Sequence, residues 1–304
     1  MTLSIDTADT KDGILVYPAQ DCVGYHLLSA FLRLAKNCKG LVLQKNQAAP
    51  VPACPVIEHN FYAPRPGNWL LKAEDLGAAV LILENEVQNN TPPSTQSLDE
   101  LLAFAQTLLS VHGDLHLVFV FPRNFPEAAI AQFLKLGKKI TVFVSPPTFA
   151  FGDHSLMDLS LKHRSTPLPM LKKLRQPELS VGLVSAPDLV GFLISALQNS
   201  VAYGKVFWVP EQLKDLNVWV DVFKKYFDEQ EISFIDHFLS NFRTSPFNKV
   251  AFNKTSAAAS VSAVDPREFF PNPLQSLDRY MKSSFENFTR TPQRPEHFPA
   301  RRAL

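Results

Sequence analysis

The chain has 304 residues, of which 46% are hydrophobic and 19% are charged, so it is long and apolar enough to bury a large core. Its formal net charge of +1 excludes a strongly basic nucleic-acid-binding protein as the first interpretation. No apolar run reaches the ~18 residues that a membrane-spanning helix needs, and the polar N-terminus has neither the basic nor the apolar region of a secretory signal.

Apolar strands alternate with amphipathic helices through residues 1–150. A strand at Ile14–Tyr17 is followed by a helix whose apolar positions are Val23, Leu27, Ala30, Phe31 and Leu34, and Gly40 closes this unit. The alternation continues with strands at Leu41–Leu43, Ala78–Leu83, Leu115–Phe121 and Ile140–Val144, and with helices at Ser97–Val111 and Glu127–Leu136. Such continuous apolar strands are typical of a parallel sheet covered on both faces. We predict a Rossmann-like α/β domain with a doubly wound, mostly parallel sheet over residues 1–150.

Residues 151–243 predict a smaller C-terminal α/β lobe. The expected elements are a strand at Val181–Val184, a helix from Pro187 to Leu197 and a strand at Lys205–Val209. A further helix is indicated by apolar residues on one face, namely Leu216, Trp219, Val220, Phe223 and Phe227.

Residues 244–304 differ in composition from the rest and predict an extended tail. They contain seven Pro, seven Phe and no Gly, with nine Lys or Arg against five Asp or Glu. Within the tail, Asn272 and Pro273 form a helix-start signal. The apolar positions of the amphipathic helix predicted over residues 273–288 are Leu274, Leu277, Met281, Phe285 and Phe288.

This amphipathic helix has two interpretations. It folds back onto its own body, or it docks in a groove of another subunit and carries the partner-binding residues. Further phenylalanines, Phe269 and Phe270 among them, are expected to act as anchors, because a few aromatic side chains can supply most of a binding energy.

The first strand–helix unit reads ILVYPAQDCVGYHLLSAFL and is the most informative stretch. It resembles the extended short-chain dehydrogenase/reductase family, in its nucleotide-sugar epimerase branch, where G-x-x-G-x-x-G binds a dinucleotide. The three glycine positions fall on Pro18, Asp21 and Gly24, so only the glycine for helix–strand packing is present. Asp21 also places a carboxylate where a pyrophosphate would lie. We therefore expect no cofactor.

The resemblance extends over about 230 residues by the order of elements, including Val181–Leu189 with Asp188 opening a helix and Gln212–Phe227 as the family's late helix. It implies a catalytic Tyr with a Lys four residues later, which lowers the pKa of the Tyr. None of the six tyrosines has a Lys at that spacing, and Glu127–Leu136, the expected carrier, has no Tyr. The preceding strand ends in Phe-Pro-Arg rather than Ser or Thr. We predict no catalytic residues and no enzyme activity.

Other candidate sites are better explained as structural residues. Cys22 lies near a helix start, where the pKa of a thiol can fall, but a small buried side chain is the favoured interpretation. His112 and His116 have a helical ligand spacing, yet a helix end separates them and no third metal ligand is evident. Lys45 follows the second strand, where some relatives of the family bind a 2′-phosphate, and a solvated lysine is favoured. The three cysteines form no CxxC pair, which predicts a reducing cytoplasm and no metal site.

The sequence thus predicts a non-catalytic pseudo-enzyme that serves as a cytoplasmic scaffold or adaptor, binding other protein subunits through its tail. It is expected to bind no nucleic acid and to insert in no membrane. A multi-protein assembly such as a bacterial secretion complex would suit this role. Two alternatives remain: an NADP(H)-sensing regulator, and an atypical reductase or epimerase-like enzyme that uses other residues.

Overall fold

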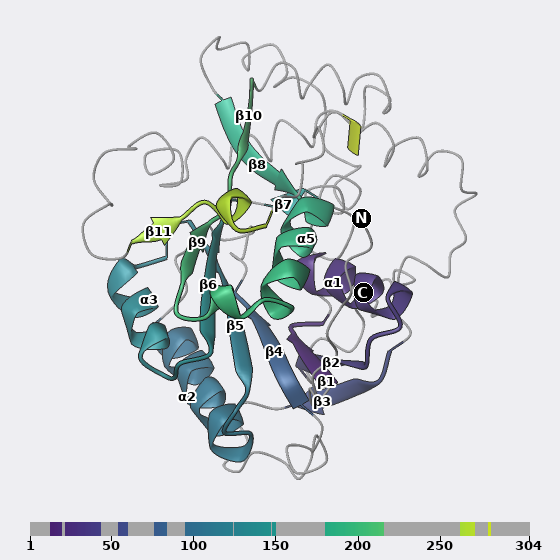
Figure 1. The fold of residues 1–304 in the computed structure, drawn as a ribbon, viewed down its shortest axis with the longest axis vertical. Helices are drawn as coiled ribbons and strands as arrows, with labels where there is room; N and C mark the ends of the chain where they lie inside the picture. The colour runs from purple at the N-terminus through teal and green to yellow at the C-terminus, as the bar shows by residue number, and fades with distance from the viewer. Residues whose placement is uncertain are drawn as a thin grey trace, which may run out of the picture.

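An eight-stranded parallel sheet forms the centre of the molecule (Figure 1). The computed structural model describes residues 13–19, 22–43, 54–59, 76–83, 95–123, 125–146, 148–149, 180–215, 262–270 and 279–280. The strands of the sheet are β1 (Gly13–Tyr17), β2 (Cys38–Leu43), β3 (Val56–His59), β4 (Leu76–Ile82), β5 (His116–Pro122), β6 (Ile140–Ser145), β9 (Val206–Trp208) and β11 (Ala263–Val264). Their spatial order is β11-β9-β6-β5-β4-β1-β2-β3, and each neighbouring pair is parallel.

Helices cover both faces of this sheet, which confirms the doubly wound fold. On one face, α1 (Cys22–Arg33) and α5 (Ala186–Leu197) pack over a core that includes Phe31 and Phe192. On the other face, α2 (Thr95–Val111) and α3 (Glu127–Leu134) pack over a second core. Every residue of β5 and β6 is buried, as continuous apolar strands between two helix layers require.

Phenylalanine fills much of the core beneath α2 and α3. Phe133 of α3 lies 4.8 Å from Phe119 and 5.0 Å from Phe121 of β5, measured between ring centroids. Phe125, in the loop before α3, stacks on Phe121 at 3.9 Å. These rings fix α3 against the central strand, so the high phenylalanine content serves packing here.

The sequence predicted that Gly40 closes the first strand–helix unit. In the structure, Gly40 instead lies inside strand β2. A Cβ atom on Gly40 would lie 2.9 Å from the Cβ of Ala19 and 3.2 Å from a methyl of Leu28. Glycine at this strand position therefore lets the β1–α1 turn and α1 approach β2 closely.

A smaller sheet consists of β7 (Thr148–Phe149), β8 (Ser180–Ser185) and β10 (Gln212–Asp215), in the order β10-β8-β7. The predicted late helix starting at Gln212 is wrong in its first residues, because Gln212–Asp215 pair antiparallel with β8 and form a strand. Its remaining residues, 216–227, lie outside the described part of the chain. β8 leads directly into α5, where the Ser185 hydroxyl accepts a hydrogen bond from the Asp188 backbone N–H (3.3 Å) and donates one to the Asp188 carboxylate (2.6 Å).

Part of the predicted tail belongs to the body. β11 extends the large sheet beside β9, and a short 3₁₀ helix, η4 (Pro266–Glu268), follows it. Phe270 is 4% exposed, and its ring lies 5.3 Å from that of Phe207, while Phe269 contacts the same ring at 5.7 Å. These two phenylalanines thus pack on their own chain, because β11 brings them over the apolar face of β9.

The predicted helix 273–288 lies outside the described residues except for Arg279 and Tyr280, both of which are helical. Among the helices of the described ranges, none combines the length and apolar character needed to cross a bilayer.

Candidate functional site

The strand order places the candidate site at the carboxyl ends of the central strands. Chain order reverses between β1 and β4, which are neighbours in the sheet. In open α/β sheets, ligands bind outside the carboxyl ends of the strands at such a reversal. Two corners of this edge are described: the β1–α1 turn, and the corner formed by the ends of β5 and β9.

The β1–α1 turn is held by close packing. Pro18 follows β1 and has no backbone N–H, and the N–H of the fully buried Ala19 donates to the carbonyl of Leu41 in β2 (2.9 Å). Gly24, in the first turn of α1, faces the carbonyl oxygen of Pro18, and a Cβ atom on Gly24 would overlap that oxygen. Glycine is therefore required here for the approach of α1 to the turn.

Two described residues of this turn differ from what a dinucleotide-binding turn needs. A pyrophosphate at such a turn is bound by backbone N–H groups and the helix N-terminus. Pro18 offers no N–H, and the N–H of Ala19 is already paired within the fold. Asp21, the other residue at a glycine position, lies outside the described residues. The described part of the turn thus keeps the packing function of the motif, and Pro18 and Ala19 supply no free N–H for a phosphate.

At the second corner, a largely buried arginine follows β5. Arg123 donates through Nη2 to the carbonyl oxygen of Val209 (2.7 Å), and its Nη1 lies 3.3 Å from Oε1 of Glu211. The side chains of Arg123 and Glu211 are 14% and 12% exposed. The guanidinium carbon also lies 4.7 Å from the ring centroid of Trp208, the last residue of β9.

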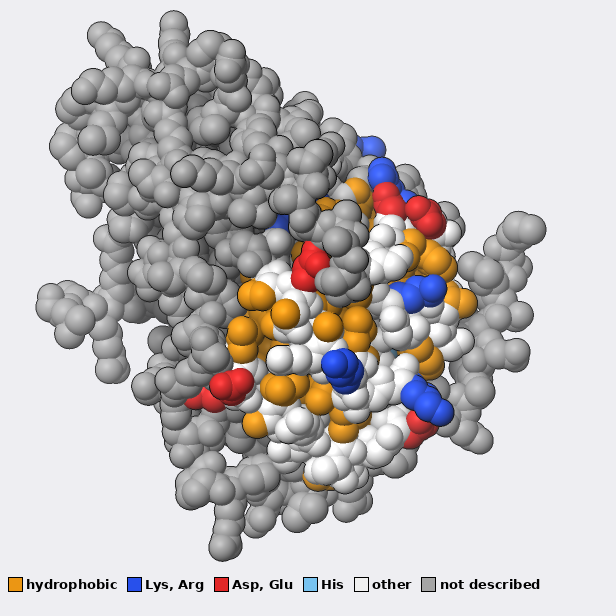
Figure 2. All heavy atoms as spheres, turned by 90° about the vertical axis from the view of Figure 1, so that its left-hand side faces the viewer, with side chains coloured by type: hydrophobic (Ala, Val, Ile, Leu, Met, Phe, Trp, Pro, Cys, Tyr) orange, Lys and Arg blue, Asp and Glu red, His pale blue; other side chains and the backbone are white. Residues whose placement is uncertain are grey.

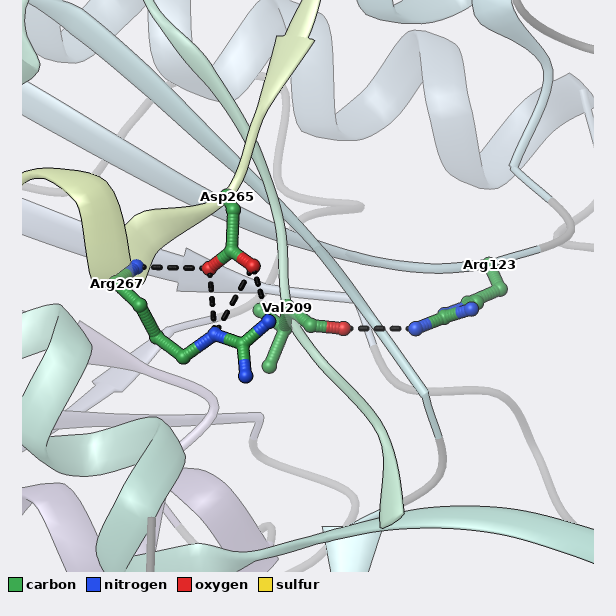
Figure 3. A network of polar contacts seen from close by, with 4 residues as sticks. All are labelled: Arg123, Val209, Asp265 and Arg267. Carbon is green, nitrogen blue, oxygen red and sulfur yellow. Dashed lines mark hydrogen bonds and ion pairs between the residues drawn. The ribbon is translucent and has the colours of Figure 1, made fainter. Parts of the chain in front are cut away.

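Figure 3 shows Arg123 approaching Val209 from one side of the chain, with Asp265 and Arg267 on the other. Asp265 caps η4 by accepting a hydrogen bond from the backbone N–H of Arg267, and it also accepts from the Arg267 guanidinium. These hydrogen bonds lower the pKa of the Asp265 carboxyl. The residue that follows β9, Val209, is therefore held by Arg123 through its carbonyl and by Val144 of β6 through its N–H.

The charge of the buried arginine is only partly compensated. Burial lowers the pKa of Arg123 and the nearby Glu211 carboxylate raises it, with burial the larger influence. The Nε atom of Arg123 is buried and has no hydrogen-bond partner among the described residues. Glu211 in turn lies against Gly182 of β8, where a Cβ atom would overlap the carboxylate oxygen Oε2.

Among the described residues of this edge, none is the tyrosine or hydroxyl that the resemblance implies. Arg123 stands after β5, where the family would place a hydroxyl, and α3 contains no tyrosine. Tyr203 lies at the opposite, amino edge, where its ring contacts that of His116 (4.6 Å between centroids).

His116 belongs to a polar cluster that the sequence analysis missed. Thr141 donates its single hydroxyl proton to the carbonyl of Ala202 (2.8 Å), so the 2.9 Å contact between its oxygen and Nε2 of His116 requires the histidine to donate. Burial and the charge of Lys139 lower the pKa of His116 to about 4. The imidazole is therefore neutral at physiological pH, and only the pairing of β5 with β6 brings these residues together.

The other sequence candidates gain no support as ligands. His112 follows the end of α2 and His116 begins β5, so they do not share a helix. Within the described ranges, no group of three or more His, Cys, Asp or Glu could hold a metal ion. Cys38 and Cys54 are free, and burial is the main cause that raises the pKa of Cys38 to about 11. The side chain of Cys22 and all of Lys45 lie outside the described set.

The chain shares its fold with reductases and sugar-nucleotide epimerases. Gre2 from Candida albicans is 10% identical, with a TM-score of 0.61 over 91% of this chain and 98% of that one. Yeast methylglyoxal/isovaleraldehyde reductase Gre2, complexed with NADPH, is 11% identical, with a TM-score of 0.57 over 91% and 98%. UDP-N-acetylglucosamine 4-epimerase from Bacillus cereus is 10% identical, with a TM-score of 0.55 over 91% and 99%.

No family model matches the sequence, and no curated protein matches it either. The structural neighbours establish a Rossmann-like α/β fold, which this chain shares with reductases and nucleotide-sugar epimerases. The predicted partner-binding residues of the tail, Leu274, Leu277, Met281, Phe285 and Phe288, lie outside the described residues.

Proposed function

We propose that this chain is a non-catalytic protein with a reductase-like fold, which acts as a scaffold or adaptor subunit. The observation that carries the proposal is the β1–α1 turn. Gly24 retains the packing function of the glycine motif, while Pro18 has no N–H and the N–H of Ala19 is paired with Leu41, so neither of these two residues offers a donor to a phosphate. A body of this kind keeps its rigidity without the ability to bind the cofactor.

The second corner supports the same proposal. The residue after β5 contributes to an ion pair with Glu211 and supplies no proton-transfer group. The sequence contains no Tyr with a Lys four residues later, the pair that the resembled chemistry requires. Both observations favour loss of activity over a modified version of it.

The helices α2 and α3 support a role in binding proteins. Residues 101–112 and 128–134 contain no Asp, Glu, Lys or Arg. Figure 2 shows apolar side chains gathered on the side of the molecule formed by these helices. The hydroxyls of Thr107 and Ser110 donate to carbonyls of their own helix, to Ala103 and Thr107 respectively, so they need no outside partner. Apolar side chains gathered on one face favour contact with another protein.

The decisive experiment is calorimetric titration of the full chain with NADPH and with NADH. Yeast Gre2, which was crystallised with NADPH, is the positive control. We expect no heat of binding at micromolar concentrations. Binding that is abolished by Gly24→Leu in a folded variant would overturn the proposal in favour of an NADP(H)-sensing regulator. Oxidation of NADPH with an aldehyde substrate would favour an atypical reductase.

A further inference from the structure

Arg123 contacts Glu211, and Glu211 lies against Gly182, so these three residues bring together three segments that are distant in sequence. Arg123 directly follows the central strand β5 of the large sheet, whereas Glu211 directly precedes β10 of the small sheet. Gly182 lies on β8, opposite Leu213 of β10 in the antiparallel register. The ion pair therefore bridges the two sheets at the carboxyl edge of the larger one.

We propose that Arg123, Glu211 and Gly182 form a latch that holds the small sheet in a closed position over the carboxyl ends of β5 and β9. Arg123 supplies the charge from the large sheet and Glu211 the opposite charge from the small sheet. Gly182 provides the space that the Glu211 carboxylate occupies. The latch concerns how the sheets are held together, so it stands whether or not the chain binds a dinucleotide.

The Arg123–Glu211 ion pair is better suited to fixing the position of the small sheet than to raising the free energy of unfolding. Charge-assisted N–H···O contacts usually measure about 2.7–2.9 Å, whereas Nη1 of Arg123 lies 3.3 Å from Glu211. Nε of Arg123 has no described partner. A buried ion pair with such incomplete compensation adds little net stability, because desolvation offsets most of the attraction. Removing one partner leaves an isolated buried charge, and that charge would draw in water and separate the sheets.

The position of the Glu211 carboxylate depends on the absence of a side chain at Gly182. A methyl group at this position would overlap the Glu211 carboxylate and displace it. Displacement removes Glu211 from Arg123 without changing either charged residue. A substitution at residue 182 thus provides an independent way to open the latch.

The test is hydrogen exchange of the full chain, comparing amides of β8 and β10 with those of β1 and β4. Glu211→Gln and Gly182→Ala should each speed exchange in β8 and β10 on the order of tenfold and leave β1 and β4 unchanged. The double variant Arg123→Met with Glu211→Leu should restore slow exchange, because an apolar pair needs no charge compensation. Arg267→Met is the matched control, since Arg267 is 54% exposed and pairs with Asp265 outside the latch.

Two results would overturn the latch. One is unchanged exchange in β8 and β10 for both Glu211→Gln and Gly182→Ala. The other is a double variant that exchanges faster than Glu211→Gln alone, since the pair would then be a stabilising contact with no separate closing role. If Glu211→Gln fails to fold, Gly182→Ala and the double variant still decide the outcome. Neither result bears on dinucleotide binding, so the latch and the proposed function fail independently.

Discussion

The first strand–helix unit and the C-terminal segment are attached to the same sheet in opposite ways. In the first unit, Gly24 lacks a side chain, and this absence lets α1 approach the carbonyl of Pro18. In the C-terminal segment, residues 262–270, the large side chains of Phe269 and Phe270 provide the attachment by packing on Phe207. The first region needs backbone proximity, and the second needs buried apolar area. Substitutions should therefore affect them by different mechanisms.

The largest effect is expected at Phe270. Replacing this 4% exposed ring with Ala should lower the free energy of unfolding by about 3–5 kcal/mol, because it leaves a cavity against Phe207. Phe269→Ala is the graded control, since Phe269 is only half-buried and should cost less, although its ring also lies 4.9 Å from Nζ of Lys205. Urea unfolding followed by circular dichroism measures both. Equal small losses for the two variants would mean that the segment is not part of the body.

The second effect is expected at Gly24. Gly24→Ala should lower the free energy of unfolding by about 1–3 kcal/mol, and Gly24→Leu by more. The added atoms would overlap the backbone carbonyl oxygen of Pro18, which can move only if the backbone of the turn moves. Gly113→Ala is the matched control, since a Cβ there meets nothing within 4 Å. Thermal unfolding of the three variants tests this expectation. A melting temperature of Gly24→Leu equal to that of Gly113→Ala would remove the packing explanation of the first unit.

The difference between these regions also explains what the sequence could predict. The first unit is local: strand, turn and helix follow one another within residues 13–33, so apolar spacing and one glycine were enough to predict them. The attachment of Phe269 and Phe270 depends on β11 pairing with β9, whose residues lie over 50 positions earlier. Nothing in the two-residue strand Ala263–Val264 signals that pairing.

The candidate site shows the same limit. The loss of the glycine motif at Pro18 could be predicted, because the motif is contiguous in sequence. The contact between Arg123 and Glu211 could not, since it joins residues 88 positions apart through the meeting of two sheets. The same holds for His116 and Thr141, which only the pairing of β5 with β6 brings together.

The pH dependence of the free energy of unfolding tests the contribution of a buried residue of the central sheet, His116, against that of the C-terminal segment. An unfolded histidine has a pKa of about 6.5, and His116 in the folded chain has a pKa of about 4. The unfolded state therefore binds more protons between these values, and the free energy of unfolding should fall by up to ~1.4 kcal/mol per pH unit on acidification from 6.5 to 4. His116→Gln should flatten this slope in urea unfolding. An unchanged slope would contradict the assignment of a neutral, buried His116.

Below that window, the C-terminal segment should respond separately. The pKa of Asp265 is lowered by Arg267, so the stabilisation it gives is present above its ordinary pKa of 3.8 and is lost as pH falls through its folded value. Asp265→Asn removes this lower step and leaves the His116 step in place. Because both side chains of the pair are solvent-accessible, the expected change is small.

The smallest effect on stability is expected from removing residues 271–304. This truncation keeps Phe270 and the contacts of η4, so the melting temperature should stay within about 2 °C of the full chain. Removing residues 263–304 instead deletes β11, Phe269 and Phe270, and should destabilise the body as strongly as Phe270→Ala. A large loss for the shorter truncation would show that the predicted helix 273–288 packs on its own body.

The same segment carries the partner-binding hypothesis. We expect the truncation after Phe270 to abolish co-purification of the tagged chain with its native partner, because the apolar face of helix 273–288 is lost. Met281→Asp with Phe285→Asp should have the same effect at full length. Gln275→Asp with Ser283→Asp adds equal charge to the opposite face of that helix and is the matched control, which should retain the partner. If the control loses the partner as completely as the apolar-face variant, added charge rather than the apolar face accounts for the loss. The docking-arm hypothesis would then be wrong, while the proposal that the chain binds no dinucleotide would be unaffected.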